Sequence, residues 1–395
     1  MLEPSLIARV RREIPVTASA TYVYLNVGTM GPSPSPVHQA FLDAYQAWQD
    51  AGPGNPEVYH AAHGLMEPAR QALAAYLGVA PDEVALTSNS TDGVNIVMAG
   101  LDWRKGDEVL TSDQEHPAVS VPWLNVQQRY GVVGRIFNLG STVDEILSNF
   151  RAQLSGRTKL VVVSHVSSQT GVRLPVAEMT ALAHQVGALV CIDGAQACGQ
   201  FPVNVAAIGC DFYTMNGHKW LLAPGGTGGV VIRRQALERL VPAVVGAGSN
   251  EPVDYRADRR LQFVPSARRF ENATRNWALY AGLTAACAYI GTLGFENIEE
   301  RGLGMSRRLQ AELARIPGVS VKTPADPALS TGLVTWGISG WSGREQYDAL
   351  LNRFKVCGRT VGELEAVRAS CAFFNLEEEI ELLLRSVATL AKERA

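Results

Sequence analysis

The chain has 395 residues, a net charge of -3 and 18% charged side chains, a composition typical of a globular protein with one large and one smaller domain. The chain has no surplus of basic residues, which argues against nucleic-acid binding. No apolar run approaches the ~18 residues of a membrane span, and charged side chains interrupt residues 1–15, where a signal peptide needs an apolar core. We therefore expect a cytoplasmic protein without a nucleic-acid or membrane partner.

The cysteines are not spaced as metal ligands or as a disulfide framework. No CxxC pair occurs, and several cysteines lie inside apolar runs that predict strands or helices. We expect reduced and mostly buried thiols and no metal site. The residues concerned are Cys191, Cys198, Cys210, Cys287, Cys357 and Cys371.

The first part of the chain alternates helical patterns with irregular loops. Residues 1–14 predict a short amphipathic helix, and residues 22–26 predict a strand. The loop VGTMGPSPSP follows, rich in glycine and proline, and a helix is expected to start near Pro36. Residues 52–60 break the helical pattern again, and residues 65–79 predict a helix with one apolar side.

The middle of the chain predicts a doubly wound, mostly parallel sheet. Strand patterns start near residues 84, 108, 160, 188, 211 and 229, and helical patterns separate most of them. Residues 277–294 then predict a long, largely apolar helix. Amphipathic helices near 299–315 and 377–393, with strand-like pieces at 319–321 and 333–338, predict a small α+β C-terminal domain. We assign residues 16–280 to the large domain, and residues 1–15 with 281–395 to the small one.

Two strand ends in this sheet are candidate ligand sites. The strand at 84–87 leads into SNSTDG, a turn of small polar residues that opens a helix. Free N–H groups and the helix dipole make such a turn an anion site, although a helix cap is the commoner use of these residues. Asp193 ends another strand, and a buried carboxylate there requires a cationic partner.

The loop NGHKW carries the most reactive candidate, Lys219. A lysine that is partly buried can form an imine with an aldehyde cofactor, because burial and neighbouring groups supply a neutral amine. A solvated surface lysine is the alternative for an isolated His-Lys pair. The pair is accompanied, however, by the strand-end residues described above.

Together the segments SNSTDG, EHP, SHVSSQTG, VCIDGAQACGQ and GHKW resemble the class V aminotransferase family of fold-type I pyridoxal phosphate (PLP) enzymes, which includes the cysteine desulfurases. The resemblance covers nearly the whole chain. It implies that Lys219 holds PLP, that Asp193 pairs with the pyridine nitrogen, and that His116 stacks on the ring and is a candidate proton shuttle. It also implies further cofactor-binding residues: Ser90 and Thr91 for the phosphate, Gln196 and Ser168 for the phenolic oxygen, and Asn216 and His218 beside them.

Other parts of the resemblance concern the substrate and a second subunit. Arginine suits bidentate recognition of a carboxylate, and Arg368 matches the family's carboxylate-binding arginine, with Arg359 as a candidate second clamp. A surface salt bridge is the alternative for either. Thr274 in ATRN resembles the residue that completes a partner's phosphate site, which implies a homodimer with shared active sites. The substrate side is expected to include Asn26, Thr29 and, on weaker grounds, Tyr59.

The cysteine pattern narrows the reaction. Only eight residues separate Arg359 from Arg368, and none is the cysteine that relays a persulfide in many desulfurases. A persulfide relay through an enzyme cysteine is therefore not expected. The combined motifs look most like the cysteine/cystine C-S lyases of class V. This resemblance implies a carbon-sulfur β-lyase that acts on cysteine, cystine or an S-substituted cysteine, with Lys219 as general base, and forms pyruvate, ammonia and a sulfide, persulfide or thiol. A class V aminotransferase or an epimerase of the isopenicillin N type stays open. A non-catalytic PLP-fold sensor is disfavoured, because Lys219, Asp193 and His116 are all present.

Overall fold

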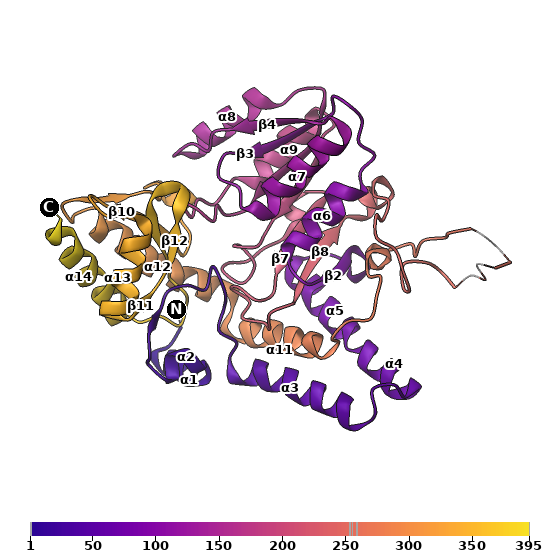
Figure 1. The fold of residues 1–395 in the computed structure, drawn as a ribbon, viewed down its shortest axis with the longest axis horizontal. Coiled ribbons are helices and arrows are strands. Elements are labelled where there is room, and N and C mark those ends of the chain that lie inside the picture. The colour runs from indigo at the N-terminus through magenta and orange to yellow at the C-terminus, as the bar shows by residue number, and fades with distance from the viewer. Residues whose placement is uncertain (1, 253, 255, 258–259, 395) are drawn as a thin grey trace.

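A seven-stranded sheet forms the centre of the molecule (Figure 1). The computed structural model describes residues 2–252, 254, 256–257 and 260–394. The strand order across the sheet is β2-β8-β7-β6-β5-β3-β4. The strands are β2 (Val84–Thr87), β3 (Glu108–Ser112), β4 (Val133–Phe137), β5 (Thr158–Ser164), β6 (Leu189–Asp193), β7 (Phe212–Asn216) and β8 (Gly228–Ile232).

Most strand pairs in this sheet are parallel, as predicted. Only β8 differs, because it runs antiparallel to both β2 and β7. The register of β5 and β6 places Ser164 opposite Asp193, and that of β6 and β7 places Asp193 opposite Thr214. Polar residues from neighbouring strands therefore meet at one edge of the sheet.

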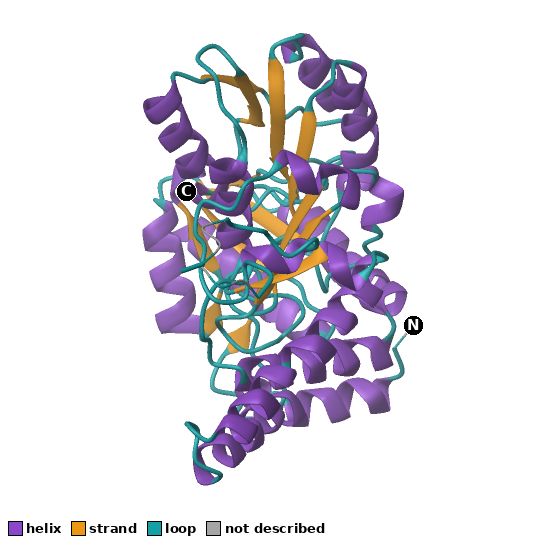
Figure 2. Cartoon of the chain, turned by 90° about the vertical axis from the view of Figure 1, so that its right-hand side faces the viewer, coloured by secondary structure: helices purple, strands orange, loops and turns teal. Residues whose placement is uncertain are grey.

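The sheet separates two apolar layers. Along β5, Val161 and Val163 pack into one cluster, whereas Leu160 and Val162 pack into the other. Successive side chains of a strand point to opposite faces, so this continuous apolar run is buried on both sides. Figure 2 shows helices covering the strands on both sides.

Each face of the sheet has its own helices. The helices α6 (Ser90–Gly100) and α7 (Pro117–Tyr130) contribute apolar side chains to one layer. The opposite layer receives side chains from α5 (Met66–Leu77), α8 (Val143–Gln153), α9 (Val176–Gln185), the short α10 (Val205–Ile208) and α11 (Ala278–Leu293). In α5 the predicted apolar side is confirmed, because Ala69, Leu73 and Leu77 are all buried.

The C-terminal part forms a second, smaller sheet with its own core. The strand order is β12-β13-β10-β9, and all pairs are antiparallel. A separate apolar cluster joins this sheet to the adjacent helices. The elements are β9 (Val319–Val321), β10 (Leu333–Ile338), β12 (Arg359–Val361), β13 (Ala366–Ser370), α12 (Phe295–Leu313), α13 (Gly343–Phe354) and α14 (Glu377–Glu393).

The N-terminal segment connects the two parts. Strand β1 (Val23–Tyr24) pairs in parallel with β11 (Val356–Cys357), next to the small sheet. Helix α3 (Ser35–Asp50) instead packs along α11, beside the large sheet. The remaining N-terminal helices are α1 (Pro4–Glu13), α2 (Pro15–Ala18) and α4 (Pro56–Gly64). The division into residues 16–280 and the two flanking segments stays a prediction.

Some elements escaped the sequence analysis. Strand β4 lies at the sheet edge with Val133 and Ile136 exposed, so it lacks the apolar run of its neighbours. Helix α13 begins with a capping box in which Ser342 and Glu345 each bond the other's backbone N–H. The S-x-x-E spacing of that box is a recognisable helix-start signal. The strand predicted to start near residue 160 starts two residues earlier, at Thr158.

Among the described residues, no single helix combines the length and the apolar character needed to cross a membrane. Helices α11 and α12 meet that test only together, as a pair bent by 74°.

Candidate active site

A cavity of about 300 Å³ lies where the parallel strands of the large sheet end. Ser164, Asp193 and Asn216, the last residues of β5, β6 and β7, all line it. Ligands of open α/β sheets bind at this edge. The cavity brings together most of the residues predicted from the sequence, namely Thr29, Ser90, Thr91, His116, Ser168, Asp193, Gln196, Asn216, His218, Lys219 and Arg359.

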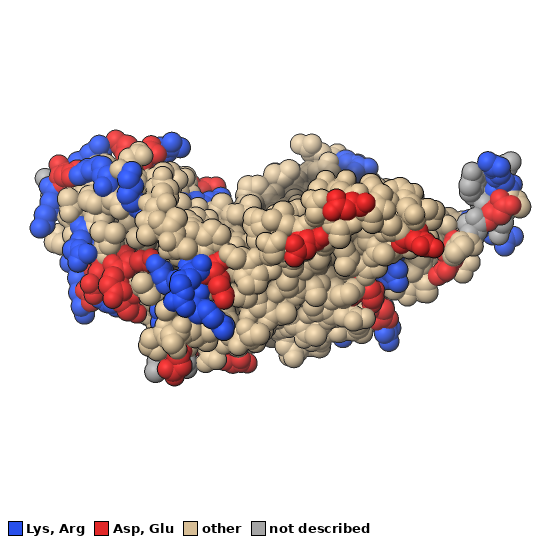
Figure 3. Space-filling view, turned by 90° about the horizontal axis from the view of Figure 1, so that it is seen from below, with Lys and Arg blue, Asp and Glu red and all other residues tan. Residues whose placement is uncertain are grey.

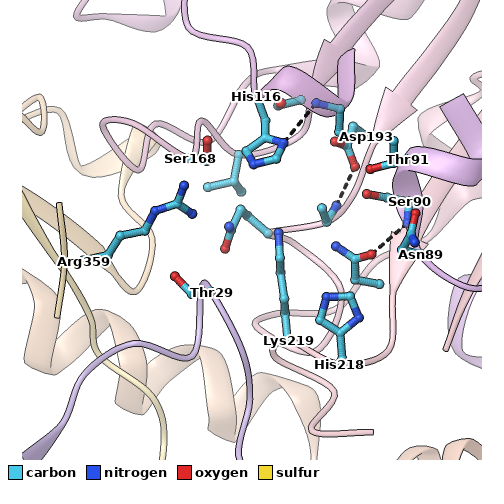
Figure 4. Close-up of a pocket in the computed structure, with 16 residues that line it drawn as sticks. Thr29, Asn89, Ser90, Thr91, His116, Ser168, Asp193, His218, Lys219 and Arg359 are labelled. Carbon is cyan, nitrogen blue, oxygen red and sulfur yellow. Dashed lines mark hydrogen bonds between the residues drawn. The ribbon is translucent and has the colours of Figure 1, made fainter. Parts of the chain in front are cut away.

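Lys219 extends into the middle of the cavity (Figure 4). It follows β7 on a turn that hydrogen bonds hold in place: the Gly217 N–H donates to the Thr227 carbonyl at 2.8 Å, and the Gly31 N–H donates to the His218 carbonyl at 2.7 Å. A side chain at Gly31 would collide with the Lys219 carbonyl, so this close approach requires glycine. The lysine therefore stands on a fixed backbone.

The surroundings of Lys219 favour its neutral form. Its side chain is 9% exposed, and burial lowers the pKa of Lys219 to about 8. The carboxylate of Asp193 opposes this shift, whereas the charges of Arg368 and Arg359 add to it. An amine with this pKa is available as a nucleophile and as a base near neutral pH.

Asp193 is a buried carboxylate without a cationic partner. It is 3% exposed, and it forms no ion pair with any side chain that the structure describes. Its Oδ1 accepts hydrogen bonds from the Ala195 N–H at 3.0 Å and the Thr214 hydroxyl at 3.3 Å. Burial of an unpaired carboxylate is costly, so a cationic ligand group is required to complete this site.

The start of α6 forms the anion-binding end of the cavity. Asn89 caps the helix by accepting the Asp92 N–H at 2.9 Å, and Asn216 Oδ1 accepts the Ser90 N–H at 2.7 Å. The structure shows no partner for the Thr91 N–H or for the hydroxyls of Ser90 and Thr91 within the residues it describes. Because Asn89 is the cap, both hydroxyls remain free for an anion at the positive end of the helix dipole.

His116 caps a helix and also lines the cavity. It is the N-cap of α7, because its Nδ1 accepts the Ala118 N–H at 3.1 Å. Its ring also lines the cavity, beside Lys219. Burial and the Lys219 charge lower the pKa of His116. The lowered pKa favours the neutral imidazole, and because Nδ1 accepts a hydrogen bond, the proton of that neutral form is on Nε2.

Glu115, next to His116, is a supporting residue that the sequence analysis missed. Its carboxylate accepts hydrogen bonds from the Ser164 hydroxyl at 2.6 Å, the Ser164 N–H at 3.0 Å and the Ser112 hydroxyl at 2.6 Å. It thus ties the end of β3 to the end of β5, directly behind the cavity. Burial raises the pKa of Glu115 to about 7. A glutamate beside a candidate histidine was the only signal in the sequence.

The two predicted arginines differ in position. Arg359, on β12, lines the cavity and has no acidic partner among the described residues. Arg368, on β13, is fully buried and does not line it, but its Nη1 donates at 2.5 Å to the carbonyl of Ser168, which does. The Nε and Nη2 groups of Arg368 have no hydrogen-bond partner among the residues that the structure describes. Burial, with repulsion from Arg359, lowers the pKa of Arg368.

Besides Arg368, three predicted site residues lie outside the cavity. Asn26 is close to Cys357, and its buried Oδ1 has no partner. The Tyr59 hydroxyl lies 3.3 Å from the Thr274 hydroxyl, and the Tyr59 ring packs edge-on against Trp277. The structure therefore joins Tyr59 to Thr274 but separates both from the cavity of their own chain.

The residues present fit PLP on physical grounds. The free donors at the start of α6 suit its phosphate, and the buried carboxylate of Asp193 suits a protonated pyridine nitrogen. Lys219 provides the amine for the aldehyde, and the neutral His116 ring provides a flat surface beside it. His218 lines the same cavity and has a buried, unpartnered Nδ1.

Comparison with known proteins agrees with this arrangement. Residues 23–383 match the family model described as Aminotransferase class-V. The chain is 30% identical to a probable cysteine desulfurase of Methanothermobacter thermautotrophicus, with 97% of each chain covered, and 31% identical to an isopenicillin N epimerase of Amycolatopsis lactamdurans, with 98% of each covered.

A solved structure adds a more specific likeness. The cystine C-S lyase C-DES, in complex with its reaction product cysteine persulfide, superposes with a TM-score of 0.88 at 30% identity, over 95% of this chain and 99% of that one. A variant of C-DES has glycine covalently linked to its PLP cofactor. The chain described here belongs to the class V aminotransferase family and is a PLP-dependent enzyme of fold type I.

Proposed function

We propose that the protein is a carbon-sulfur β-lyase that acts on cystine or an S-substituted cysteine. The proposal depends mainly on one observation: Lys219 and Arg359 line the cavity, and Arg368 contacts the lining residue Ser168 from behind. Among the described residues neither arginine has an acidic partner, and no cysteine lines the cavity. The likeness to C-DES supports it. With cystine and one water molecule, the products would be pyruvate, ammonia and cysteine persulfide.

The cysteines do not suit a persulfide relay. None of the six, all of which the structure describes, lines the cavity. Cys357 and Cys371, which flank the arginines in sequence, have pKa values that burial raises, so their thiolates are disfavoured. The segment between β12 and β13 is a short turn, with Gly362–Leu364 in a 3-10 helix, and is no long loop that could carry a thiol to the cofactor.

Different residues would carry out the separate steps of the elimination. PLP, when bound, withdraws electrons from the substrate Cα. Arg368 and Arg359 would orient the substrate by its carboxylate, so that the Cα–H bond points toward Lys219. Lys219 would remove that proton as general base. His116, with its proton on Nε2, would donate a hydrogen bond to an anionic group beside the cofactor ring.

The Arg368→Met variant should raise KM for cystine by roughly 30- to 1,000-fold, because the buried carboxylate of the bound substrate would lose its charged partner. We expect a smaller change in kcat. Steady-state pyruvate formation measures both constants. The Arg173→Met variant is the matched control, since Arg173 pairs with Glu299 outside the cavity. An unchanged KM in Arg368→Met would place the carboxylate clamp elsewhere.

Loading of the apoprotein with PLP should depend on pH through Lys219. With a pKa of about 8, the neutral amine fraction rises with pH below 8 and is nearly constant above 9. The loading rate should follow that fraction, as recorded by stopped-flow absorbance. Because the Arg359 charge lowers this pKa, Arg359→Met should move the curve to higher pH. A rate that still climbs tenfold per unit between pH 9 and 10 would contradict a lowered pKa.

An amino-acid epimerase is the second candidate, because isopenicillin N epimerases are among the relatives at 31–32% identity. It requires the same Cα proton removal but returns a proton to the opposite face. A class V aminotransferase likewise shares the first step and differs in where the proton returns.

The deciding experiment incubates the purified holoenzyme with cystine, cysteine and S-methylcysteine in D₂O, without any keto acid. Pyruvate and sulfide are assayed together, and Cα deuterium and optical rotation are followed. Catalytic pyruvate is expected for the lyase. Racemised, deuterated substrate without pyruvate would assign an epimerase. A single-turnover change of the cofactor band, with restoration by a keto acid, would assign an aminotransferase.

We also propose a homodimer in which Thr274 completes the partner's phosphate site. Thr274 and its neighbour Tyr59 lie outside their own cavity, and Tyr59 is exposed. The face in Figure 3 has few charged side chains over its middle. Helix α3 exposes Leu42 and Tyr45. Sedimentation equilibrium of the holoenzyme tests this assembly, and a monomer with full activity would refute shared sites.

A further inference from the structure

The side chain of Gln196 is held at both ends of its amide group. Its Nε2 donates to the Gly28 carbonyl at 2.7 Å, and its Oε1 accepts the indole N–H of Trp220 at 2.9 Å. Gln196 and Trp220 are each 3% exposed. Trp220 directly follows Lys219 in the chain, so the same turn that fixes the lysine also fixes this indole.

Both contacts select the same orientation of the amide. An indole N–H can only donate a hydrogen bond, and a backbone carbonyl can only accept one. A flipped amide would place its NH₂ group against the indole donor and its oxygen against the Gly28 carbonyl. One Nε2 hydrogen is left over in the observed orientation, and Gln196 lines the cavity.

We propose that Trp220 is a positioning residue, whose indole N–H makes Gln196 present an N–H, and not its carbonyl, to the anionic ring oxygen of the bound cofactor. The role concerns cofactor binding and is independent of which bond of the substrate is broken. It therefore goes beyond the proposed lyase activity, and it holds equally for an epimerase or an aminotransferase.

The surroundings make Trp220 a rigid anchor. Its ring lies against Gly332, where an added Cβ would be 3.1 Å away. The Gly332 N–H donates to Gln200 Oε1 at 2.5 Å, and Gln200 Nε2 donates to the Gln196 carbonyl at 2.7 Å. The indole thus packs against Gly332, which is linked through the Gln200 side chain to the Gln196 carbonyl.

The same contacts hold the loop that contributes Thr29 to the cavity. The Gly28 carbonyl accepts from Gln196, and the Gly28 N–H donates to the Ser370 hydroxyl at 3.2 Å. A Cβ on Gly28 would lie 2.9 Å from Arg368 Nη2 and 3.0 Å from Gln196 Oε1. The amide of Gln196 thereby connects the turn of Lys219 to the strand that carries Arg368.

The test is the pH titration of the visible cofactor band in the Trp220→Phe holoenzyme. A hydrogen-bond donor to the cofactor ring oxygen reduces the negative charge on that oxygen. This charge favours the protonated form of the bond between Lys219 and the cofactor. Weakening that donor should raise the midpoint of the titration by about half to one pH unit. Phenylalanine preserves an aromatic ring against Gly332 and removes only the N–H. Cofactor content and thermal midpoint are measured alongside.

A double-mutant cycle separates positioning from packing. Gln196→Leu should raise the midpoint more than Trp220→Phe, and adding Trp220→Phe to Gln196→Leu should change nothing further. Trp336→Phe is the matched control, because Trp336 is equally buried and its Nε1 has no partner; it should leave the midpoint unchanged. An equal shift from Trp220→Phe with and without Gln196 would overturn the proposal.

A second variant keeps the test decisive if Trp220→Phe does not fold. Glutamate at position 196 still accepts the Trp220 N–H but has no hydrogen to donate. Gln196→Glu should therefore raise the midpoint above that of the unmodified enzyme. A midpoint unchanged in Gln196→Glu would show that the residue donates nothing to the cofactor, and the role of Trp220 would fall with it.

Discussion

The Lys219→Ala variant should lose turnover by more than ~10³-fold while it keeps its fold, because a positioned general base alone contributes about 10²- to 10⁴-fold. Alanine removes both the amine that attaches the cofactor and the base beside the substrate Cα. Among the described residues no other lysine lines the cavity, so no neighbouring amine can replace it. The loss should fall on kcat, since in the proposed mechanism Arg359 and Arg368 would still bind the substrate carboxylate.

Pyruvate formation under saturating cystine measures this loss, and circular dichroism with thermal unfolding checks the fold. We expect a thermal midpoint no lower than that of the unmodified protein, because the lowered pKa of Lys219 destabilises the folded state. This destabilisation is complete below a pH of about 8 and declines as the pH rises toward the ordinary lysine value of 10.5. Lys105→Ala is the control, since Lys105 lies just before β3, near Asp107 and Arg157 and away from the strand ends that line the cavity. Retention of turnover in Lys219→Ala would remove this lysine from the mechanism.

The strand ends of the large sheet were accessible to sequence analysis because buried parallel strands have a strong local signature. The run at 160–163 is apolar and largely β-branched, and the structure buries it on both faces. Once the strands are placed, the fold dictates that Asp193 and the turn before Ser90 meet at one edge. The cavity confirms that meeting.

The supporting contacts were not accessible in the same way, because they depend on segments that are distant in sequence. Glu115 is buried by β5, and Gln196 is oriented by Gly28 and Trp220. The spacing of residues within a single segment does not predict such hydrogen bonds. The N-cap of α6 shows a smaller difference: Asn89, Ser90 and Thr91 are all suitable caps by type, and only the structure assigns the cap to Asn89.

The different positions of Arg359 and Arg368 also become visible only in the three-dimensional structure. Arg359 and Arg368 are close in sequence, yet one lines the cavity and the other is buried behind Ser168. A turn at Gly362–Leu364 reverses the chain, so that Arg359 pairs with Arg368 across two antiparallel strands. Side chains paired in this way lie on the same face of the sheet, which explains how both charges reach Lys219.

The Asp193→Asn variant should lower kcat by roughly 10²- to 10⁴-fold at full cofactor occupancy. Removing one partner of a buried charge pair costs about 3–5 kcal/mol, and each ~1.36 kcal/mol corresponds to a factor of ten in rate. Asparagine preserves the size of the side chain, and its oxygen still accepts the Ala195 N–H, so the loss would reflect charge. Without that charge, the pyridine nitrogen of the cofactor would give up its proton and withdraw fewer electrons from Cα.

The measurement is kcat per bound cofactor, because weaker cofactor binding alone would otherwise imitate a catalytic defect. Asp211→Asn is the matched control: Asp211 is also a buried carboxylate that accepts a backbone N–H, but it lies at the opposite end of β7 and pairs with His184. The control should retain its rate per cofactor. A near-normal rate in Asp193→Asn would assign the ring-nitrogen contact to another group and leave this buried carboxylate without the cationic partner that its burial requires.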